Sequence, residues 1–214
     1  MVTVEYHVDL KEVQSSARLA ALLGDGAQRA PFDRLAWWQM LERHCTLPPL
    51  LAVAREGDNA VVLPLRRGRG RLEGLANWYS FRLAPVASAG ADRLRLLTAI
   101  ARDLARKTAR IELAGVPDED CSATTLARAF RKAGWVVVRS PCDSNHVLPL
   151  NGRSFARYLE DRPGPLRTTL KRKRGKVRTV VLTRFDAEAW QAYEAIYAQS
   201  WKPREGSPDF LRAF

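Results

Sequence analysis

The chain of 214 residues is 46% hydrophobic and 27% charged, which is enough apolar material for one or two packed globular domains. No apolar run approaches the ~18–20 residues that a membrane-spanning helix needs, and the N-terminus lacks the basic and apolar regions of a secretory signal. The formal net charge of +12 favours anionic partners, although an Arg-rich composition with much Ala and Gly is also typical of GC-rich genomes.

Cysteine usage favours a reducing compartment. Cys45, Cys121 and Cys142 are an odd number, lie far apart and form no C-x-x-C pair. We therefore expect a cytoplasmic protein. The three His and three Cys residues are scattered without the spacing of metal ligands, so we expect no metal site.

The first 70 residues predict two helices and a β-hairpin. Apolar residues recur at helical spacing over Ser15–Leu23 and Phe32–His44, and Asp33 can cap the amino end of the second helix. Two apolar runs, Leu50–Glu56 and Ala60–Arg66, are separated by the turn sequence GDN. We expect these two runs to pair as antiparallel strands.

The next 80 residues alternate between strand and helix patterns. The sequence RGRGR at Arg67–Arg71 predicts a turn. Beyond it we expect the strands Leu72–Phe81, Ala109–Leu113, Trp135–Arg139 and Asn145–Leu150, and the helices Ala91–Lys107 and Ser122–Ala133. Helices interleaved with strands predict a mixed α+β (α/β) domain over residues 1–150, with a mostly antiparallel sheet flanked by helices.

The remainder begins with a strongly basic segment, Leu166–Arg178, in which seven of thirteen residues are Lys or Arg and none is acidic. Its first part, Pro165–Arg174, predicts a helix. A strand pattern follows at Thr179–Phe185, then an aromatic helix, AEAWQAYEAIYAQSW, and the start of another helix. We interpret residues 151–178 as a basic helical connector and residues 179–214 as the beginning of a second domain.

Several runs of the chain resemble one family of enzymes. RSFARYLEDRPGPLRTTLKRKRGKV, followed by YEAIYAQSWKPREGSPDFLRAF, is similar to the CelD-type GNAT-fold acyltransferases, which are linked with cellulose biosynthesis and related to FemAB-like tandem-GNAT proteins. The upstream pieces PFDRLAWWQML, LLAVAREGDNAVVLPLRR, LANWYSF, VPDED and SNHVLPL occur in the order of that family. The resemblance implies two GNAT-like halves, an acyl donor such as acyl-CoA, and an amine-bearing small molecule or glycan precursor as acceptor.

The chain departs from the family at the donor site. The GNAT pattern places the donor pyrophosphate on an Arg/Gln-x-x-Gly-x-Gly/Ala turn between a strand and a helix, where backbone N–H groups face the anion. The closest sequence here, Leu65–Gly70, begins with Leu and lies between two predicted strands, which favours a basic hairpin turn. By family analogy the donor motif would follow Phe214, so that the chain is truncated and inactive by itself.

The resemblance also implies candidate site residues near the C-terminus. A loop with an aromatic ring, a cation and a carboxylate can hold an acceptor amine or the distal end of the donor, and Glu205 can act as a general base for the attacking amine. The alternative is that the aromatic residue closes the core and the charged residues are solvated. These candidates are Trp201, Lys202 and Glu205.

Two further groups of residues suggest binding. A basic cluster can attract the phosphates of an acyl-CoA or another anion, or it can be a solvated helix face; it consists of Lys171, Arg172, Lys173 and Arg174. Aromatic and amide side chains at strand ends can line an acceptor groove, or they can be a packed pair and a capped turn. These are Asn77, Trp78, Tyr79, Asn145 and His146.

Two alternatives to an enzyme remain open. The basic segment can bind nucleic acid, although we find no aromatic strand pair or helix-turn-helix pattern that would support this function. The chain can instead be a non-catalytic half that docks on a partner, which predicts an exposed apolar patch around Val180, Leu182, Tyr193 and Tyr197.

Overall fold

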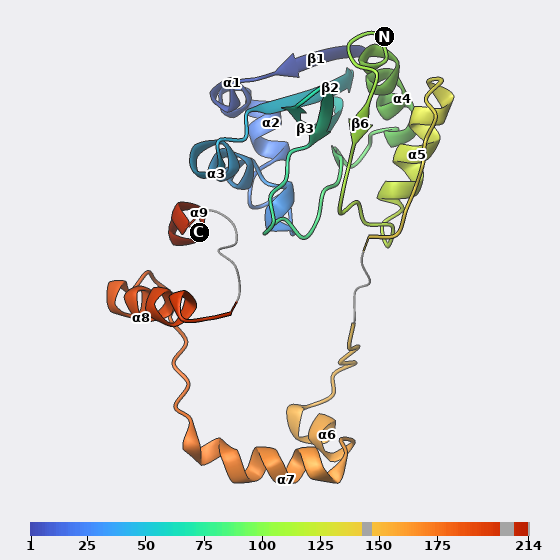
Figure 1. Cartoon of the computed structure of the whole chain (residues 1–214). Helices are drawn as coiled ribbons and strands as arrows, with labels where there is room; N and C mark the ends of the chain where they lie inside the picture. Colours follow the sequence, from blue (N-terminus) through green and yellow to red (C-terminus); the bar gives the residue numbers. More distant parts are fainter. Residues whose placement is uncertain (143–146, 202–207, 214) are drawn as a thin grey trace. The chain divides into compact units, whose positions relative to one another are not determined.

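The computed structural model describes residues 1–142, 147–201 and 208–213 (Figure 1). The chain forms two compact units, one of residues 1–143 together with 204–214 and the other of residues 144–203. The fold is a mixed α and β fold, as the sequence predicted. Its sheet lies entirely in the first unit, as far as the residues described extend.

The first unit is built on a six-stranded sheet with the order β1-β2-β3-β4-β6, and β5 pairs with β3 beside this path. All pairs are antiparallel except β4 and β6, which are parallel and are connected through helix α4. The strands are β1 (Thr3–His7), β2 (Pro49–Glu56), β3 (Asn59–Gly68), β4 (Arg71–Gly74), β5 (Val86–Ala87) and β6 (Ile111–Glu112).

Helices cover both faces of this sheet, which explains why β2 and β3 are continuous apolar runs. Alternate residues of β2 point to opposite faces, so that Ala52 packs toward one core and Leu51 toward the other. One core lies under α4 (Arg93–Leu104) and α5 (Ser122–Lys132). The other lies under α1 (Leu10–Ser15), α2 (Ala17–Leu22) and α3 (Leu35–Cys45), with the short η1 (Pro31–Asp33) preceding α3.

The last helix, α9 (Pro208–Ala213), belongs to the first unit and packs against α3. Its Phe210 is 1% exposed and is a member of the core that α1, α2 and α3 cover. The sequence predicts the start of a second domain over residues 179–214, whereas the packing of Phe210 joins α9 to the first unit.

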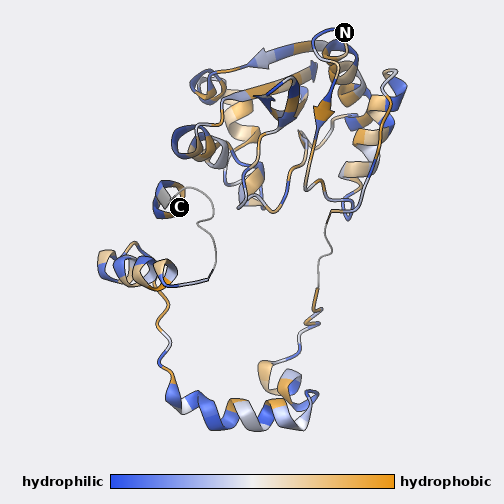
Figure 2. Ribbon diagram, viewed as in Figure 1, coloured by the Kyte–Doolittle hydropathy of each residue, from blue (hydrophilic) through white to orange (hydrophobic). Residues whose placement is uncertain are grey.

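The second unit contains four short helices and no strand among its described residues. None of the described side chains in it is buried, and its helices carry both hydrophilic and hydrophobic residues (Figure 2). The helices are α6 (Phe155–Glu160), α7 (Gly164–Lys173), η2 (Arg174–Lys176) and α8 (Ala187–Ala198).

Most predicted elements of the first unit are present. The predicted hairpin forms β2 and β3, the RGRGR sequence makes the turn from β3 to β4, and helices occupy most of the predicted helical ranges. The ranges differ at two places. The strand predicted over Leu72–Phe81 ends at Gly74. The helix predicted over Ser15–Leu23 corresponds to α2 alone; α1 precedes it, was not predicted, and is separated from α2 by Ser16, whose backbone is extended.

The strand predictions for Trp135–Arg139 and Thr179–Phe185 are wrong, and residues 147–150 of the strand predicted over Asn145–Leu150 are not a strand either. The first case shows the reason. The indole N–H of Trp135 donates to Ala101 O at 2.9 Å, whereas Val136 and Val138 are 94% and 87% exposed. Side chains of this segment therefore do alternate between packed and exposed positions, as in a strand. None of the described strands pairs with it, so it forms no sheet hydrogen bonds.

Candidate ligand site on the 77–82 loop

The loop that follows β4 is shaped by hydrogen bonds among its own residues. Asn77 Oδ1 accepts from the backbone N–H of Tyr79 and from the Ser80 hydroxyl, both at 3.0 Å. Ser80 Oγ in turn accepts from Asn77 N and from Trp37 Nε1 of α3, both at 3.1 Å. Asn77 Nδ2 also donates to Cys45 Sγ at 3.6 Å. The polar groups of Asn77 and Ser80 are thus used to fix the loop, which supports the capped-turn interpretation of Asn77.

Two aromatic side chains of this loop face solvent. Trp78 is 72% exposed and Phe81 is 81% exposed, and the Phe81 ring lies edge-on to Phe32 with centroids 5.9 Å apart. Tyr79, between them in sequence, is half-buried and stacks on Phe210 with centroids 5.7 Å apart and an interplanar angle of 6°. Trp78 and Phe81 are therefore accessible to a ligand, whereas Tyr79 joins the core, in line with its packed interpretation.

The residue after Phe81 enters a cluster of ionised side chains. Arg82 donates through Nε to Asp33 Oδ2 at 2.8 Å and through Nη2 to Asp120 Oδ2 at 2.7 Å. Asp33 is only 7% exposed, and Asp120 Oδ1 accepts from the backbone N–H of Ser122 at 3.0 Å. Two carboxylates share this one guanidinium, and Arg93 also attracts Asp33, so the formal charges of the cluster balance.

The two carboxyl groups of this cluster titrate in opposite directions. Burial raises the pKa of Asp33 above its ordinary value, and the attraction of Arg82 reduces the shift without reversing it. At Asp120, burial alone would raise the pKa, but hydrogen bonds from Arg82 and Ser122 outweigh it and hold the pKa below its ordinary value. Asp33 is accordingly the carboxyl group of the pair that takes up a proton more readily.

The 77–82 loop therefore combines exposed aromatic faces with an adjoining cluster of ion-paired carboxylates. Aromatic faces attract cations through their quadrupole, most strongly for Trp. The arrangement suits an organic cation, such as a protonated amine, that also carries apolar surface.

The other predicted binding residues lie elsewhere or outside the described part of the chain. Trp201 is 90% exposed in the second unit, which contradicts its alternative role of closing the core. The basic residues Lys171–Arg174 are all exposed on α7 and the turn after it. Four predicted site residues, Asn145, His146, Lys202 and Glu205, lie outside the described residues.

The apolar patch predicted for a docking module is largely exposed to solvent. Val180, Leu182 and Tyr193 are 60%, 53% and 43% exposed, and Tyr197 is half-buried with its ring 5.9 Å from that of Tyr193. The second unit therefore presents apolar surface that its own described residues do not cover.

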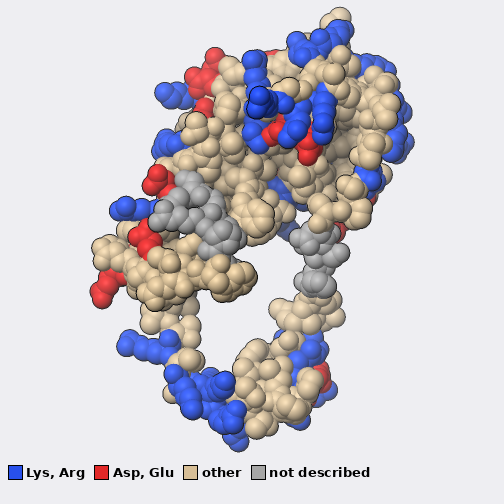
Figure 3. Space-filling view, viewed as in Figure 1, with Lys and Arg blue, Asp and Glu red and all other residues tan. Residues whose placement is uncertain are grey.

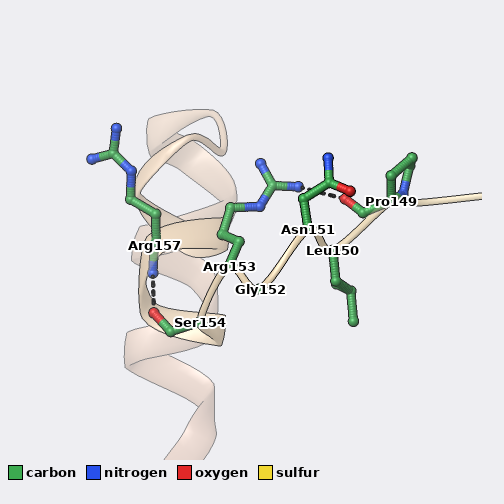
Figure 4. A pocket seen from close by; sticks show the side chains of 7 residues that line it. All are labelled: Pro149, Leu150, Asn151, Gly152, Arg153, Ser154 and Arg157. Atoms are coloured by element: carbon green, nitrogen blue, oxygen red, sulfur yellow. Dashed lines mark hydrogen bonds between the residues drawn. The ribbon is translucent and has the colours of Figure 1, made fainter.

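A hollow of about 630 Å³ lies in the second unit at the start of α6 (Figure 4). Its two cations are already engaged, because Arg153 contacts Asp161 at 3.3 Å and Arg157 contacts Glu160 at 3.0 Å. Arg153 also donates to Pro149 O at 3.5 Å, and Ser154 Oγ caps the N–H of Arg157 at 3.2 Å. We interpret the hollow as a consequence of the turn that begins α6.

The amino ends of α4 and α5, where a phosphate could bind, are occupied by carboxylates. Asp92 Oδ1 accepts from Arg95 N of α4 at 3.0 Å. At α5, Asp120 accepts from Ser122 N, and Asp118 Oδ1 accepts from Thr124 N at 2.8 Å. An anion at either end would meet a side chain of the same sign. The Gly-containing sequence Leu65–Gly70 runs into a strand-to-strand turn, as its hairpin interpretation requires.

Sequence reasoning missed the ion cluster and the buried aromatic residue of α9. It treated Asp33 as a helix cap, whereas the α3 cap position is Arg34 and Asp33 pairs with Arg82. The three charged residues lie in separate segments, so no local spacing marks them. Phe210 is an aromatic residue beside charged ones on a short helix, a pattern that can indicate a buried position. Nothing in that pattern identifies Tyr79 as the ring on which it stacks.

Comparison with known proteins gives no assignment: no protein-family model, curated protein or solved structure matches the chain significantly. Over residues 1–142, 147–201 and 208–213, no helix has both the length and the apolar character required to cross a membrane. The same residues contain no group of three or more His, Cys, Asp or Glu side chains that could hold a metal ion.

Proposed function

We propose that this chain is part of a GNAT-type acyltransferase and that its first unit binds the amine-bearing acceptor at the 77–82 loop. The observation that carries the proposal is the exposure of Trp78 and Phe81 on a hydrogen-bonded loop whose next residue, Arg82, is flanked by two carboxylates. These features match the chemistry of a protonated amine with apolar surface.

The sheet supports the same proposal. A mostly antiparallel sheet flanked by helices is what the resemblance to this family leads us to expect, and β4 and β6, which α4 connects, form its one parallel pair among the described strands. The carboxylate caps of α4 and α5 also fit a half that binds no donor phosphate. We therefore propose that acyl-CoA binds outside the described residues of this chain.

The proposed reaction is direct transfer of the acyl group. The acceptor ammonium loses one proton to a base, its nitrogen forms a bond to the thioester carbon, the carbon–sulfur bond breaks, and the thiolate takes the second proton that the nitrogen releases as the amide forms. Glu205 or a water molecule is the proposed base. In this scheme Trp78 and Phe81 orient the amine, and positioning is their contribution to the rate. We place the reaction in the cytoplasm, where acyl-CoA is available.

The test uses the product of the whole open reading frame that encodes these residues. Thiol release from acetyl-CoA is measured with a panel of amino sugars and diamines. We expect release that depends on the amine, and Trp78→Ala should raise the KM for the amine about tenfold while the KM for acetyl-CoA stays unchanged. Val138→Ala, which trims another exposed apolar side chain of the first unit, serves as the control.

The proposal fails if no amine elicits thiol release although the protein is folded. The assignment of the acceptor site to the 77–82 loop also fails if Trp78→Ala and Val138→Ala have the same KM for the amine.

A second candidate function is the binding of nucleic acid by α7. Lys171, Arg172, Lys173 and Arg174 are exposed, and none of them lies within 4.0 Å of an acidic group among the residues described. Figure 3 shows Lys and Arg side chains gathered on this part of the second unit. Binding of duplex DNA or RNA whose affinity falls steeply with salt would support this function, because each neutralised phosphate releases counterions.

A further inference from the structure

The first unit contains a groove between the β3–β4 turn and the carboxyl end of α4. Its volume is about 710 Å³, which lies within the range of about 300–1,000 Å³ that small-molecule sites occupy. The 77–82 loop does not contribute to it. The groove is therefore separate from the candidate acceptor site.

Cations enter this groove from two sides. Arg67 and Arg71 come from the β3–β4 turn, and Lys107 comes from the loop after α4. Arg71 is paired with Glu73 at 2.7 Å and with Glu112 at 3.3 Å. In contrast, no acidic side chain of the described residues lies within 4.0 Å of Arg67. Arg67 thus has all its guanidinium donors available for a ligand.

The acidic group nearest to Lys107 is already compensated. Asp103 accepts from the Tyr6 hydroxyl at 2.6 Å and from Arg106 at 2.7 Å, and Lys107 Nζ lies farther away, at 3.5 Å. The Tyr6 hydrogen bond is the main reason why the pKa of Asp103 is below its ordinary value. Lys107 Nζ also lies 5.0 Å from the centroid of the Tyr6 ring. An anion in the groove can therefore recruit Lys107 without leaving Asp103 unpaired.

The floor of the groove is apolar. Leu50, Leu72 and Leu104 line it and are 7%, 8% and 0% exposed. Figure 3 shows Lys and Arg side chains gathered over the sheet of the first unit, with acidic side chains among them. A ligand that matches both features has an anionic group for the rim and an apolar body for the floor.

We propose that this groove binds the phosphate ester of a small organic molecule. Arg67 holds two phosphate oxygens through its planar fork, and Lys107 approaches the phosphate from the opposite wall. The organic part of the ligand lies against Leu50 and Leu72. This site does not depend on the proposed acyltransferase function, because it uses none of the residues of the 77–82 loop.

Isothermal titration calorimetry on the full chain tests this site with two probes, inorganic phosphate and 2-naphthyl phosphate. We expect saturable binding of 2-naphthyl phosphate at one site, with an affinity at least about tenfold above that of inorganic phosphate, because only the ester covers the apolar floor. Arg67→Ala and Lys107→Ala should each weaken binding of 2-naphthyl phosphate about tenfold or more, as expected for loss of a charge-assisted contact.

Arg69→Ala is the matched control. Arg69 lies at the tip of the same turn, is exposed and has no ion pair within the described residues, but it does not line the groove. Equal weakening by Arg69→Ala and Arg67→Ala would overturn the proposal, because it would indicate diffuse charge attraction. Equal affinity for the two probes would also overturn it, because the apolar floor would then contribute nothing to binding.

Discussion

Tyr79 and Phe210 stack with their ring centroids 5.7 Å apart and an angle of 6° between the ring planes. Phe210 also lies edge-on to Trp37 of α3, at a centroid distance of 5.2 Å. This contact joins the last helix to the loop that carries Trp78 and Phe81. The shape of the candidate acceptor loop therefore depends on a residue at the other end of the chain.

The Phe210→Ala substitution tests this dependence. Because Phe210 is 1% exposed, its truncation leaves a cavity and should lower the free energy of unfolding by ~3–5 kcal/mol. Urea unfolding followed by circular dichroism measures the change. Phe81→Ala, which trims a side chain that is 81% exposed, should change the same quantity by less than ~1 kcal/mol. Equal effects of the two substitutions would contradict the packing of α9.

Gly74 is predicted to be required at the end of β4. A Cβ at this position would lie 2.2 Å from Cδ2 of Leu83, whose side chain is only 4% exposed. Gly74→Ala should therefore destabilise the fold by ~1–3 kcal/mol through overpacking. Gly26→Ala is the control, because a Cβ there meets no atom within 4 Å and its backbone φ is not positive. A neutral Gly74→Ala variant in urea unfolding would show that Leu83 moves aside freely.

Ser80 is predicted to stabilise the 77–82 loop through its hydroxyl. Ser80→Ala removes the acceptor of both Asn77 N and Trp37 Nε1, and leaving such donors unpaired should cost ~1–3 kcal/mol of unfolding free energy. The exposed Ser140 makes no hydrogen bond to the described residues and lies outside this loop, so Ser140→Ala should leave stability unchanged. Hydrogen exchange at Asn77 N, which should become faster only in Ser80→Ala, separates a local effect from a global one.

The stability of the protein should depend on pH through Asp120. Its pKa in the folded state lies below the ordinary value of 3.8, so the folded state binds this proton less well than the unfolded state. The stabilisation is then complete above the unfolded pKa and is lost as pH falls through the lower, folded pKa. Asp120→Asn should differ from the unsubstituted protein at pH 6, and the difference should shrink as pH falls below 3.8.

Asp33 should act in the opposite direction. Burial raises its folded pKa above 3.8, so protonation of the folded protein relieves a penalty as pH falls through that value. The loss of stability on acidification should therefore be steeper in Asp33→Asn than in the unsubstituted protein. Urea midpoints between pH 7 and pH 3 measure both variants, and parallel curves for all three proteins would refute the assigned directions.

Local sequence pattern determined much of the sheet and several helices. The apolar runs of β2 and β3 are buried on both faces, and the GDN and RGRGR sequences mark the turns at their ends. Helical spacing likewise located α4, α5, α7 and α8 to within a few residues. These features depend on backbone propensity and on apolar periodicity, both of which are local properties of the chain.

Only the tertiary structure decided which predicted strands pair and which side chains far apart in the sequence come into contact. Val136 and Val138 alternate as in a strand, yet they stay exposed because no described strand lies next to them. Arg82 pairs with Asp33 and Asp120, and Tyr79 stacks on Phe210, across long stretches of sequence. Such contacts follow from the packing of whole elements, so residue spacing, which predicted a strand over Leu72–Phe81, could reveal neither the exposure of Trp78 nor what holds its loop in place.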